Sequence, residues 1–204
     1  FVAGLSHSAL TATVLRHFAE LMLSILVFFL IINTIRDRKQ LNVLVIALMV
    51  AGALAAIIGI VLYVLPDYLA NRILSTLDIV RYPSGDVLRY IDDDASGTER
   101  AISTSVDPNV FGGMLVIVSL ITTSQLFATN PLLKRGWIIA MLLPLVLCLI
   151  LTYSRGSFVG YAFGVFLLAV FRYPKLLIYG AIGLVLILVL PPTQEYVQHF
   201  MEGV

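Results

Sequence analysis

Apolar residues run along the chain in long blocks, and short polar turns separate these blocks. The longest block, Leu41 to Leu65, has 25 residues and no charged side chain. A helix of about 20 residues crosses the hydrocarbon core of a bilayer, which is about 30 Å thick. The pattern therefore predicts an all-α, polytopic membrane helix bundle.

We interpret six blocks as transmembrane helices. In chain order they are Phe18 to Ile35, Leu41 to Leu65, Asn109 to Thr129, Trp137 to Tyr153, Ser157 to Phe171 and Leu176 to Leu190. The last two have 15 residues each and need flanking residues to reach both headgroup layers. We expect residues 1–204 to form one partial membrane domain, because the chain begins with Phe1 and an outer loop starting at 191–204 is cut short.

Composition agrees with this interpretation and excludes several classes of protein. Hydrophobic residues make up 60% of the chain and charged residues 12%, whereas soluble proteins have about 45–50% and about 25%. The net charge of +1 gives no basic excess for binding nucleic acid. The single Cys148 lies in an apolar block, so a disulfide framework and a Cys/His zinc site are excluded.

The charged residues are sorted by loop, and this sets the orientation. Basic turns at 36–39, 134–135 and 172–175 would all fall on one side, which the excess of Lys and Arg marks as cytoplasmic. The long segment Pro66 to Pro108 has four Arg against eight acidic residues. The tail after Pro191 has Glu195 and Glu202 but no Lys or Arg. With six spans and both ends of the chain outside, every connecting segment agrees with this charge rule.

The outer segment 66–108 is the main extramembrane region. Its first half predicts an interfacial helix, since Tyr68, Leu69, Ile73, Leu74, Leu77 and Val80 recur at spacings of three and four. Its second half, Tyr82 to Ser105, contains Pro and Gly and predicts a loop. The run Asp92 to Asp94 in this loop lacks the spacing of a calcium loop and is more typical of a solvated acidic patch than of a metal site.

The first candidate site lies where the third span begins. Asp107 followed by Pro108 predicts a helix N-terminus, with Asp as N-cap and Pro in the first helical position. Such an end carries free N–H groups and a partial positive charge, so it attracts anions. Arg100 lies close enough in sequence to reach it.

The second candidate site is the turn between the fourth and fifth spans. Ser154 is placed to cap the fifth helix, and Arg155 would then lie in its first turn at the outer membrane boundary. Arginine near hydrocarbon and at a helix N-terminus is unfavourable, and an anionic ligand would compensate it. Two arginines beside two helix N-termini suit a diphosphate at headgroup level. The alternative is that Arg155 only snorkels to the headgroups and that Arg100 pairs with Glu99 or the Asp run.

These two motifs resemble the O-antigen ligase and polymerase superfamily of bacterial envelope glycosyltransferases. The resemblance rests on Arg100 with Ser105-Val106-Asp107-Pro108-Asn109-Val110-Phe111-Gly112, followed by Leu151-Thr152-Tyr153-Ser154-Arg155-Gly156. It covers about half the chain, from Arg100 to Pro192, whereas the upstream half agrees only in hydropathy.

The resemblance implies a GT-C-like helix bundle in the bacterial inner membrane and a metal-independent, inverting glycan transfer at the periplasmic face. The donor would be a glycan on undecaprenyl diphosphate, the acceptor a hydroxyl of a glycan, lipid or protein, and no cofactor is expected. Arg100 and Arg155 would be the catalytic residues on the diphosphate, beside Ser105, Asn109 and Ser154 as substrate-binding residues. The family's probable general base is a histidine in a later outer loop, and His199 lacks its surrounding motif. This chain alone is expected to be inactive.

A rival from another class is a carrier of a small anion such as bicarbonate, a function also assigned to this superfamily. It would need a polar path at mid-bilayer, and the predicted spans have no Asp, Lys or Arg at their centres. His7 and His17 in the N-terminal outer segment titrate near neutral pH but are more typical of solvated surface histidines.

Overall fold

The structure is a computed structural model that describes residues 12–80, 82, 87–91, 97–178 and 180. Most of the sixth predicted span, the tail 191–204, His7, Asp92 to Asp94 and His199 lie outside the described residues. The chain divides into two units, residues 1–44 and 45–204. Each unit is described separately.

The first unit contains α2 (Ala12–Thr34) and the first turns of α3 (Arg38–Val64). Two hydrogen bonds, both involving Gln40, stabilise the turn between these two helices. The Gln40 amide donates to Asp37 Oδ1 at 2.7 Å, and the Arg36 amide donates to Gln40 Oε1 at 2.8 Å. These bonds satisfy amides that a helix N-terminus otherwise leaves unpaired, so α3 begins where the sequence places its polar turn.

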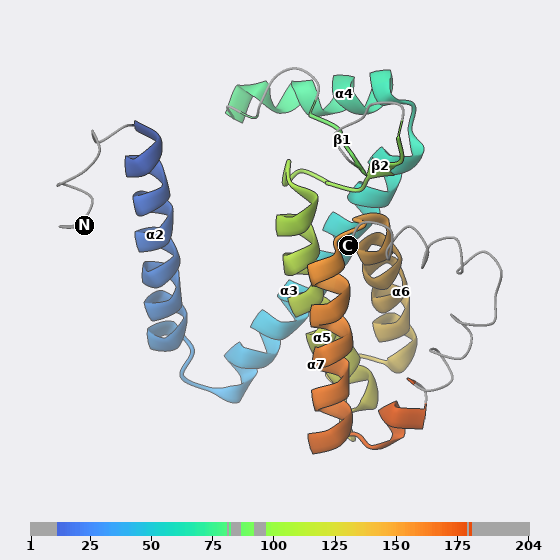
Figure 1. Ribbon diagram of the computed structural model, residues 1–204. Coiled ribbons are helices and arrows are strands. Elements are labelled where there is room, and N and C mark those ends of the chain that lie inside the picture. The colour runs from blue at the N-terminus through green and yellow to red at the C-terminus, as the bar shows by residue number, and fades with distance from the viewer. Residues whose placement is uncertain (1–11, 81, 83–86, 92–96, 179, 181–204) are drawn as a thin grey trace. The chain divides into compact units, whose positions relative to one another are not determined.

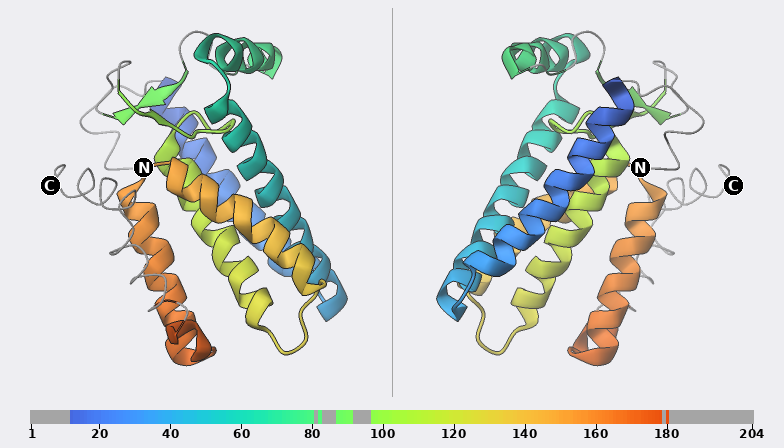
Figure 2. Two further views of the ribbon diagram at one scale, coloured as in Figure 1. Left: turned by 90° about the vertical axis from the view of Figure 1, so that its right-hand side faces the viewer. Right: turned by 90° about the vertical axis from the view of Figure 1, so that its left-hand side faces the viewer.

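The second unit contains the remainder of α3, a surface layer and three further helices. The surface layer comprises α4 (Asp67–Ser75), a 3₁₀ turn Thr76–Val80 and the strands β1 (Arg89–Tyr90) and β2 (Glu99–Arg100). The helices are α5 (Pro108–Phe127), α6 (Arg135–Leu151) and α7 (Arg155–Phe171). Figures 1 and 2 show α4 and the two short strands at the end of the bundle where α5 and α7 begin and α6 ends.

Three helices are long and apolar enough to span a membrane: Val14–Thr34 within α2, Arg38–Val64 and Pro108–Phe127, counted over the described residues. The apolar helices α6 and α7 are shorter, at 17 residues each. Large apolar side chains also point outward, including Ile117 and Leu143 at 63% and 65% exposure. Such an apolar surface suits lipid contact and indicates a membrane protein. The all-α prediction is confirmed at this level, whereas the six spans remain a prediction.

The main core lies between α3, α5 and α6, and α5 also packs along α7. Its fully buried side chains include Phe111, Leu115 and Leu145. Gly59 of α3 lets this packing close, because a Cβ there would lie 2.9 Å from Cys148 Sγ and 3.0 Å from the Phe111 ring. The sequence block that contains Gly59 therefore packs through its small residues, as membrane helices commonly do.

A second apolar cluster fixes the surface layer to the end of the bundle. Leu62 of α3 packs there with Ala70 and Leu74 of α4, with Val87 and Leu88 before β1, and with Ile102 after β2. A helix is present in the first half of the segment 66–108, as predicted, in the form of α4 and the following 3₁₀ turn, whereas its position at a membrane surface stays a prediction. Only part of its apolar stripe faces inward, since Leu74 is buried whereas Tyr68 and Ile73 are exposed.

The region predicted only as a loop, Tyr82 to Ser105, contains a two-stranded antiparallel ribbon. Arg89 pairs with Arg100, and Tyr90 pairs with Glu99. Strands of two residues are too short to show an alternating hydrophobic pattern, so local sequence does not reveal them. The ribbon matters because it carries Arg100 to the end of the helices.

Candidate functional site

The segment that follows β2 enters the helix bundle before α5 begins. Ala101, Ile102 and Ser103 are all at most 2% exposed. The Ala101 amide donates to the Leu151 carbonyl oxygen at 2.8 Å, and Ser103 Oγ donates to the Ala55 carbonyl oxygen at 3.0 Å. These bonds tie the segment to α6 and α3, so the position of Arg100 is fixed by two helices.

Arg100 is half-buried and reaches across to the C-terminal end of α6. Its Nε donates to the Thr152 carbonyl oxygen at 2.9 Å, and its Nη2 donates to Asn109 Oδ1 at 3.0 Å. A cation is favourable at a helix C-terminus, where the carbonyl oxygens carry partial negative charge. The guanidinium is therefore held between the end of α6 and the beginning of α5.

The beginning of α5 has the cap that the sequence predicts. Asp107 Oδ1 accepts hydrogen bonds from the Asn109 amide at 2.7 Å and the Val110 amide at 3.2 Å, and Pro108 is the first helical residue. Ser105 Oγ donates to the Ile102 carbonyl oxygen at 2.8 Å and also lies 3.2 Å from the Asp107 carbonyl oxygen, the alternative acceptor for its single hydrogen. Ser105 thus stabilises the turn that leads into α5.

A polar pocket of about 270 Å³ lies between the ribbon and the first turn of α5. Its lining consists of Arg89, Tyr90, Arg100, Asp107, Pro108 and Asn109. Two arginines face one carboxylate here, so the lining carries a net positive charge. Sequence reasoning identifies Arg100 and Asn109 but misses Arg89 and Tyr90, because only the strand register brings β1 to this place.

The turn between α6 and α7 places Arg155 as the first residue of α7, as predicted. Arg155 is exposed, and it belongs to the same end of the bundle as Arg100, whose Nε bonds to Thr152 three residues earlier. Arg155 is nevertheless not among the residues that line the polar pocket. The structure brings Arg100 together with Asn109 and Arg89.

Ser154 occupies the N-cap position of α7 but its side chain makes no capping hydrogen bond, contrary to the prediction. Its Oγ instead accepts a hydrogen bond from Ser157 Oγ at 2.9 Å. Both serines are buried against Gly112 of α5, where a Cβ would lie 3.3 Å from the Ser154 Cβ. Tertiary packing between α5 and α7 therefore determines the orientation of Ser154.

A second hollow of about 400 Å³ runs between α5 and α7. Its lining includes Asn109, Gly113, Val116, Ser154 and Gly160. Asn109 also lines the polar pocket, so the two hollows meet at this side chain. The groove provides small, mostly uncharged walls next to a positively charged pocket.

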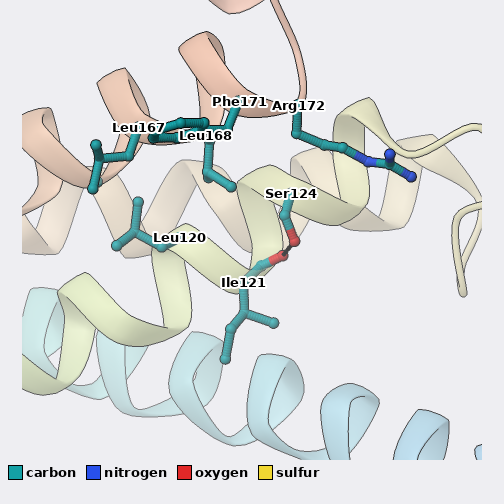
Figure 3. Close-up of a pocket in the computed structure, with 8 residues that line it drawn as sticks. Leu120, Ile121, Ser124, Leu167, Leu168, Phe171 and Arg172 are labelled. Atoms are coloured by element: carbon teal, nitrogen blue, oxygen red, sulfur yellow. Dashed lines mark hydrogen bonds between the residues drawn. The ribbon is translucent and has the colours of Figure 1, made fainter.

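Further along the same pair of helices lies an apolar pocket of about 450 Å³. Figure 3 shows that Leu120 and Ile121 of α5 line it together with Leu167, Leu168 and Phe171 of α7. Arg172 borders it at the end of α7, the end opposite Arg155. The surface between α5 and α7 therefore changes from polar to apolar along the helices.

Among the described residues, three other than glycine have left-handed backbone conformations, and all three lie at this end. They are Ser103 with φ 51°, Val106 with φ 65° and Tyr153 with φ 49°. For a β-branched residue such as Val106 this conformation is strained, and strain of this kind concentrates at functional sites. Ser103 and Val106 lie in the segment between β2 and α5, which follows Arg100, and Tyr153 lies in the turn between α6 and α7, which precedes Arg155.

Glu99 lies beside Arg100 in β2 but does not line the pocket. Burial raises the pKa of Glu99 to about 7, and the negative charge of Asp67 adds to the rise. The Tyr90 hydroxyl donates to Asp67 Oδ2 at 2.8 Å, which links α4 to β1. The two acidic residues and Tyr90 form a junction between α4 and the ribbon.

The described residues include no group of three or more His, Cys, Asp or Glu side chains that could hold a metal ion. Glu20 pairs with Arg16 one helical turn away at 2.9 Å, as helical spacing predicts. Comparison with protein-family models, curated proteins and solved structures found no match to the chain.

Proposed function

We propose that this chain is part of an O-antigen ligase-like or polymerase-like glycosyltransferase, a multi-pass protein of the bacterial inner membrane. The single observation that carries the proposal is the polar pocket at the beginning of α5, in which Arg100 is held by Thr152 and Asn109. A fixed guanidinium beside a helix N-terminus is well suited to binding phosphate groups. In this proposal the bound group is the diphosphate of an undecaprenyl diphosphate-linked glycan.

The groove between α5 and α7 supports a lipid-linked donor over a soluble one. It meets the pocket at Asn109 and continues along helices that we propose to cross the bilayer. A donor whose diphosphate lies in the pocket would place its isoprenoid chain along this groove. The glycan would then extend away from the membrane, where an acceptor glycan or lipid can approach.

The proposed reaction is a direct displacement at the anomeric carbon. The acceptor hydroxyl forms the new glycosidic bond, the bond between that carbon and the diphosphate oxygen breaks, and the hydroxyl proton passes to a base. Negative charge develops on the diphosphate as it leaves, and Arg100 stabilises this charge. We propose the same role for Arg155 from the outer end of α7, and we assign the base to no described residue.

A transfer assay tests this proposal. The full-length protein of which we propose this chain to be part is reconstituted in proteoliposomes with an undecaprenyl diphosphate-linked glycan and an acceptor glycan, and product is measured for wild type, Arg100→Ala, Arg155→Ala and Arg72→Ala. We expect loss of at least 100-fold in the first two variants, as for removal of other groups that stabilise transition-state charge. Arg72 is exposed on α4 and lines none of the described pockets, so its variant is the control.

A transport measurement on the same preparation distinguishes the proposed glycosyltransferase from a small-anion carrier. Uptake of radiolabelled bicarbonate into the same proteoliposomes, without any glycan product, would favour a small-anion carrier. Full transfer activity in both the Arg100 and Arg155 variants would refute the proposed mechanism. The helix α5 has no charged side chain along its length, which supports a site at the boundary over a path through the bilayer.

A further inference from the structure

Arg89 and Arg100 are direct cross-strand partners in the ribbon. Side chains directly opposite each other in an antiparallel pair lie on the same face, with Cβ atoms about 4.5–5.5 Å apart. Both arginines also line the polar pocket. The register therefore places two guanidinium groups on the same side of the ribbon, facing the first turn of α5.

Two like charges in this arrangement destabilise a strand pair unless something compensates them. No ion pair joins Arg89 to an acidic side chain within the part of the chain that the structure describes. The carboxylate that faces the pocket, Asp107, already accepts two backbone amides through Oδ1 as the cap of α5. A ribbon of two-residue strands has little stability of its own with which to offset the repulsion.

The pocket has the size and polarity of an anion site. Its volume of about 270 Å³ lies just below the range of about 300–1,000 Å³ that is typical of sites for drug-sized ligands. This volume suits a compact group such as a diphosphate. Guanidinium groups bind phosphate oxygens through two parallel hydrogen bonds, so two arginines match the two phosphates of such a group.

We propose that Arg89 is a binding residue for a diphosphate group and acts together with Arg100, on the opposite strand. The inference rests on the proposed function, and it adds a residue that neither the motifs nor the helix ends identify. Each strand of the ribbon thus contributes one arginine side chain to the binding of the diphosphate.

The test measures binding by isothermal titration with the chain in nanodiscs of zwitterionic lipid. Two probes are titrated, inorganic pyrophosphate and undecaprenyl diphosphate, against wild type, Arg89→Ala, Arg89→Lys, Arg100→Ala and the control Arg72→Ala. We expect Arg89→Ala to weaken binding of both probes about tenfold or more, Arg89→Lys to restore part of the loss, and Arg72→Ala to bind as wild type. Tighter binding of the lipid probe identifies a lipid headgroup as the ligand, whereas equal binding identifies a free diphosphate.

A melting curve without ligand distinguishes binding from a structural role. Removing Arg89 relieves like-charge repulsion, so the ligand-free Arg89→Ala variant should melt at the same or a higher temperature than wild type. A lower melting temperature together with unchanged affinity would overturn the inference. Wild-type affinity in Arg89→Ala with lost affinity in Arg100→Ala would refute the role of Arg89 alone, whereas a wild type that binds neither probe would refute the proposed function as well.

Discussion

Gly112 of α5 lies against Ser157 of α7 so closely that a Cβ on Gly112 would lie 3.0 Å from the Ser157 Cβ and overlap its hydroxyl oxygen. The next residue, Gly113, points away, and a Cβ there would meet nothing within 4 Å. Both glycines are in the same helix and differ by one position. The contact at Gly112 therefore holds α7, and with it Ser154 and Arg155, against the beginning of α5.

We predict that Gly112→Ala lowers the free energy of unfolding by about 1–3 kcal/mol, because the added methyl group overpacks the α5–α7 contact. Gly113→Ala should leave stability unchanged or slightly raised, since alanine favours helix and meets open space. Unfolding in mixed detergent micelles, followed by circular dichroism, measures both variants. Equal stability in the two would contradict the close contact, and Ser157→Gly should partly rescue Gly112→Ala.

The raised pKa of Glu99 predicts a pH dependence of stability. Its pKa is about 7 in the folded chain against a usual value of 4.5, so the folded state holds the proton more tightly than the unfolded state. The stabilising contribution is complete below about 4.5 and is lost as the pH rises through about 7. We expect wild type to melt at a lower temperature at pH 8 than at pH 5.5.

Two variants isolate this effect from other groups that titrate in the same range. Glu99→Gln keeps the shape but cannot ionise, so its melting temperature should change less between the two pH values. Asp67→Asn removes the second cause of the shift and should move the wild-type transition to lower pH. If Glu99→Gln retains the full pH dependence of wild type, another group is responsible.

Helix positions at this site could be predicted because local sequence determines them. Asp107 followed by Pro108 specifies a helix start that depends only on adjacent residues, and the structure has that cap. Arg155 likewise begins α7 because the polar turn before it interrupts two apolar blocks. Ser154 shows the limit of this reasoning, since its packing against Gly112 replaces the expected cap.

The pocket itself could not be predicted from the sequence. Arg100 reaches Thr152, 52 residues away, and Ser103 reaches Ala55, 48 residues away. Such contacts depend on how the helices pack, which a single sequence does not encode in any local pattern. Arg89 was missed for the same reason, because its importance follows from its register opposite Arg100.

Asn109 separates the binding role of the pocket from its stability. Asn109→Asp adds a carboxylate in the first turn of α5, where it interacts favourably with the helix dipole and with Arg100. We predict unchanged or increased thermal stability but a clear loss of pyrophosphate affinity, since the new charge repels the anion and occupies Arg100. Asn109→Ala, which only removes the acceptor, should lose less affinity. Tighter binding in Asn109→Asp would refute an anion pocket.

Asp107 allows the opposite test. Asp107→Asn should preserve the cap, because Asn is as good an N-cap as Asp, and should raise pyrophosphate affinity by removing the one carboxylate from the pocket lining. Asp107→Ala should lower the free energy of unfolding by about 1 kcal/mol through loss of the cap. Titration calorimetry and melting curves measure the two effects. An unchanged affinity in Asp107→Asn would show that the pocket charge does not control binding.

The groove between α5 and α7 gives a prediction about ligands with and without a lipid chain. Gly113 lines this groove, and a Cβ there would meet no atom within 4 Å, so Gly113→Leu places its side chain in the groove. We predict that the variant folds normally and binds inorganic pyrophosphate as wild type, but binds undecaprenyl diphosphate several-fold more weakly, because its isoprenoid chain competes with the new side chain.

The matched control for this experiment is Gly136→Leu, since a Cβ on Gly136 would also meet no atom within 4 Å but Gly136 lies in the first turn of α6, at the opposite end of the bundle. It should bind both ligands as wild type does. An equal loss of affinity for both ligands in Gly113→Leu would place the effect at the polar pocket. Unchanged binding of both would exclude the groove as the site of the lipid chain, because a side chain of that size cannot share the groove with an isoprenoid.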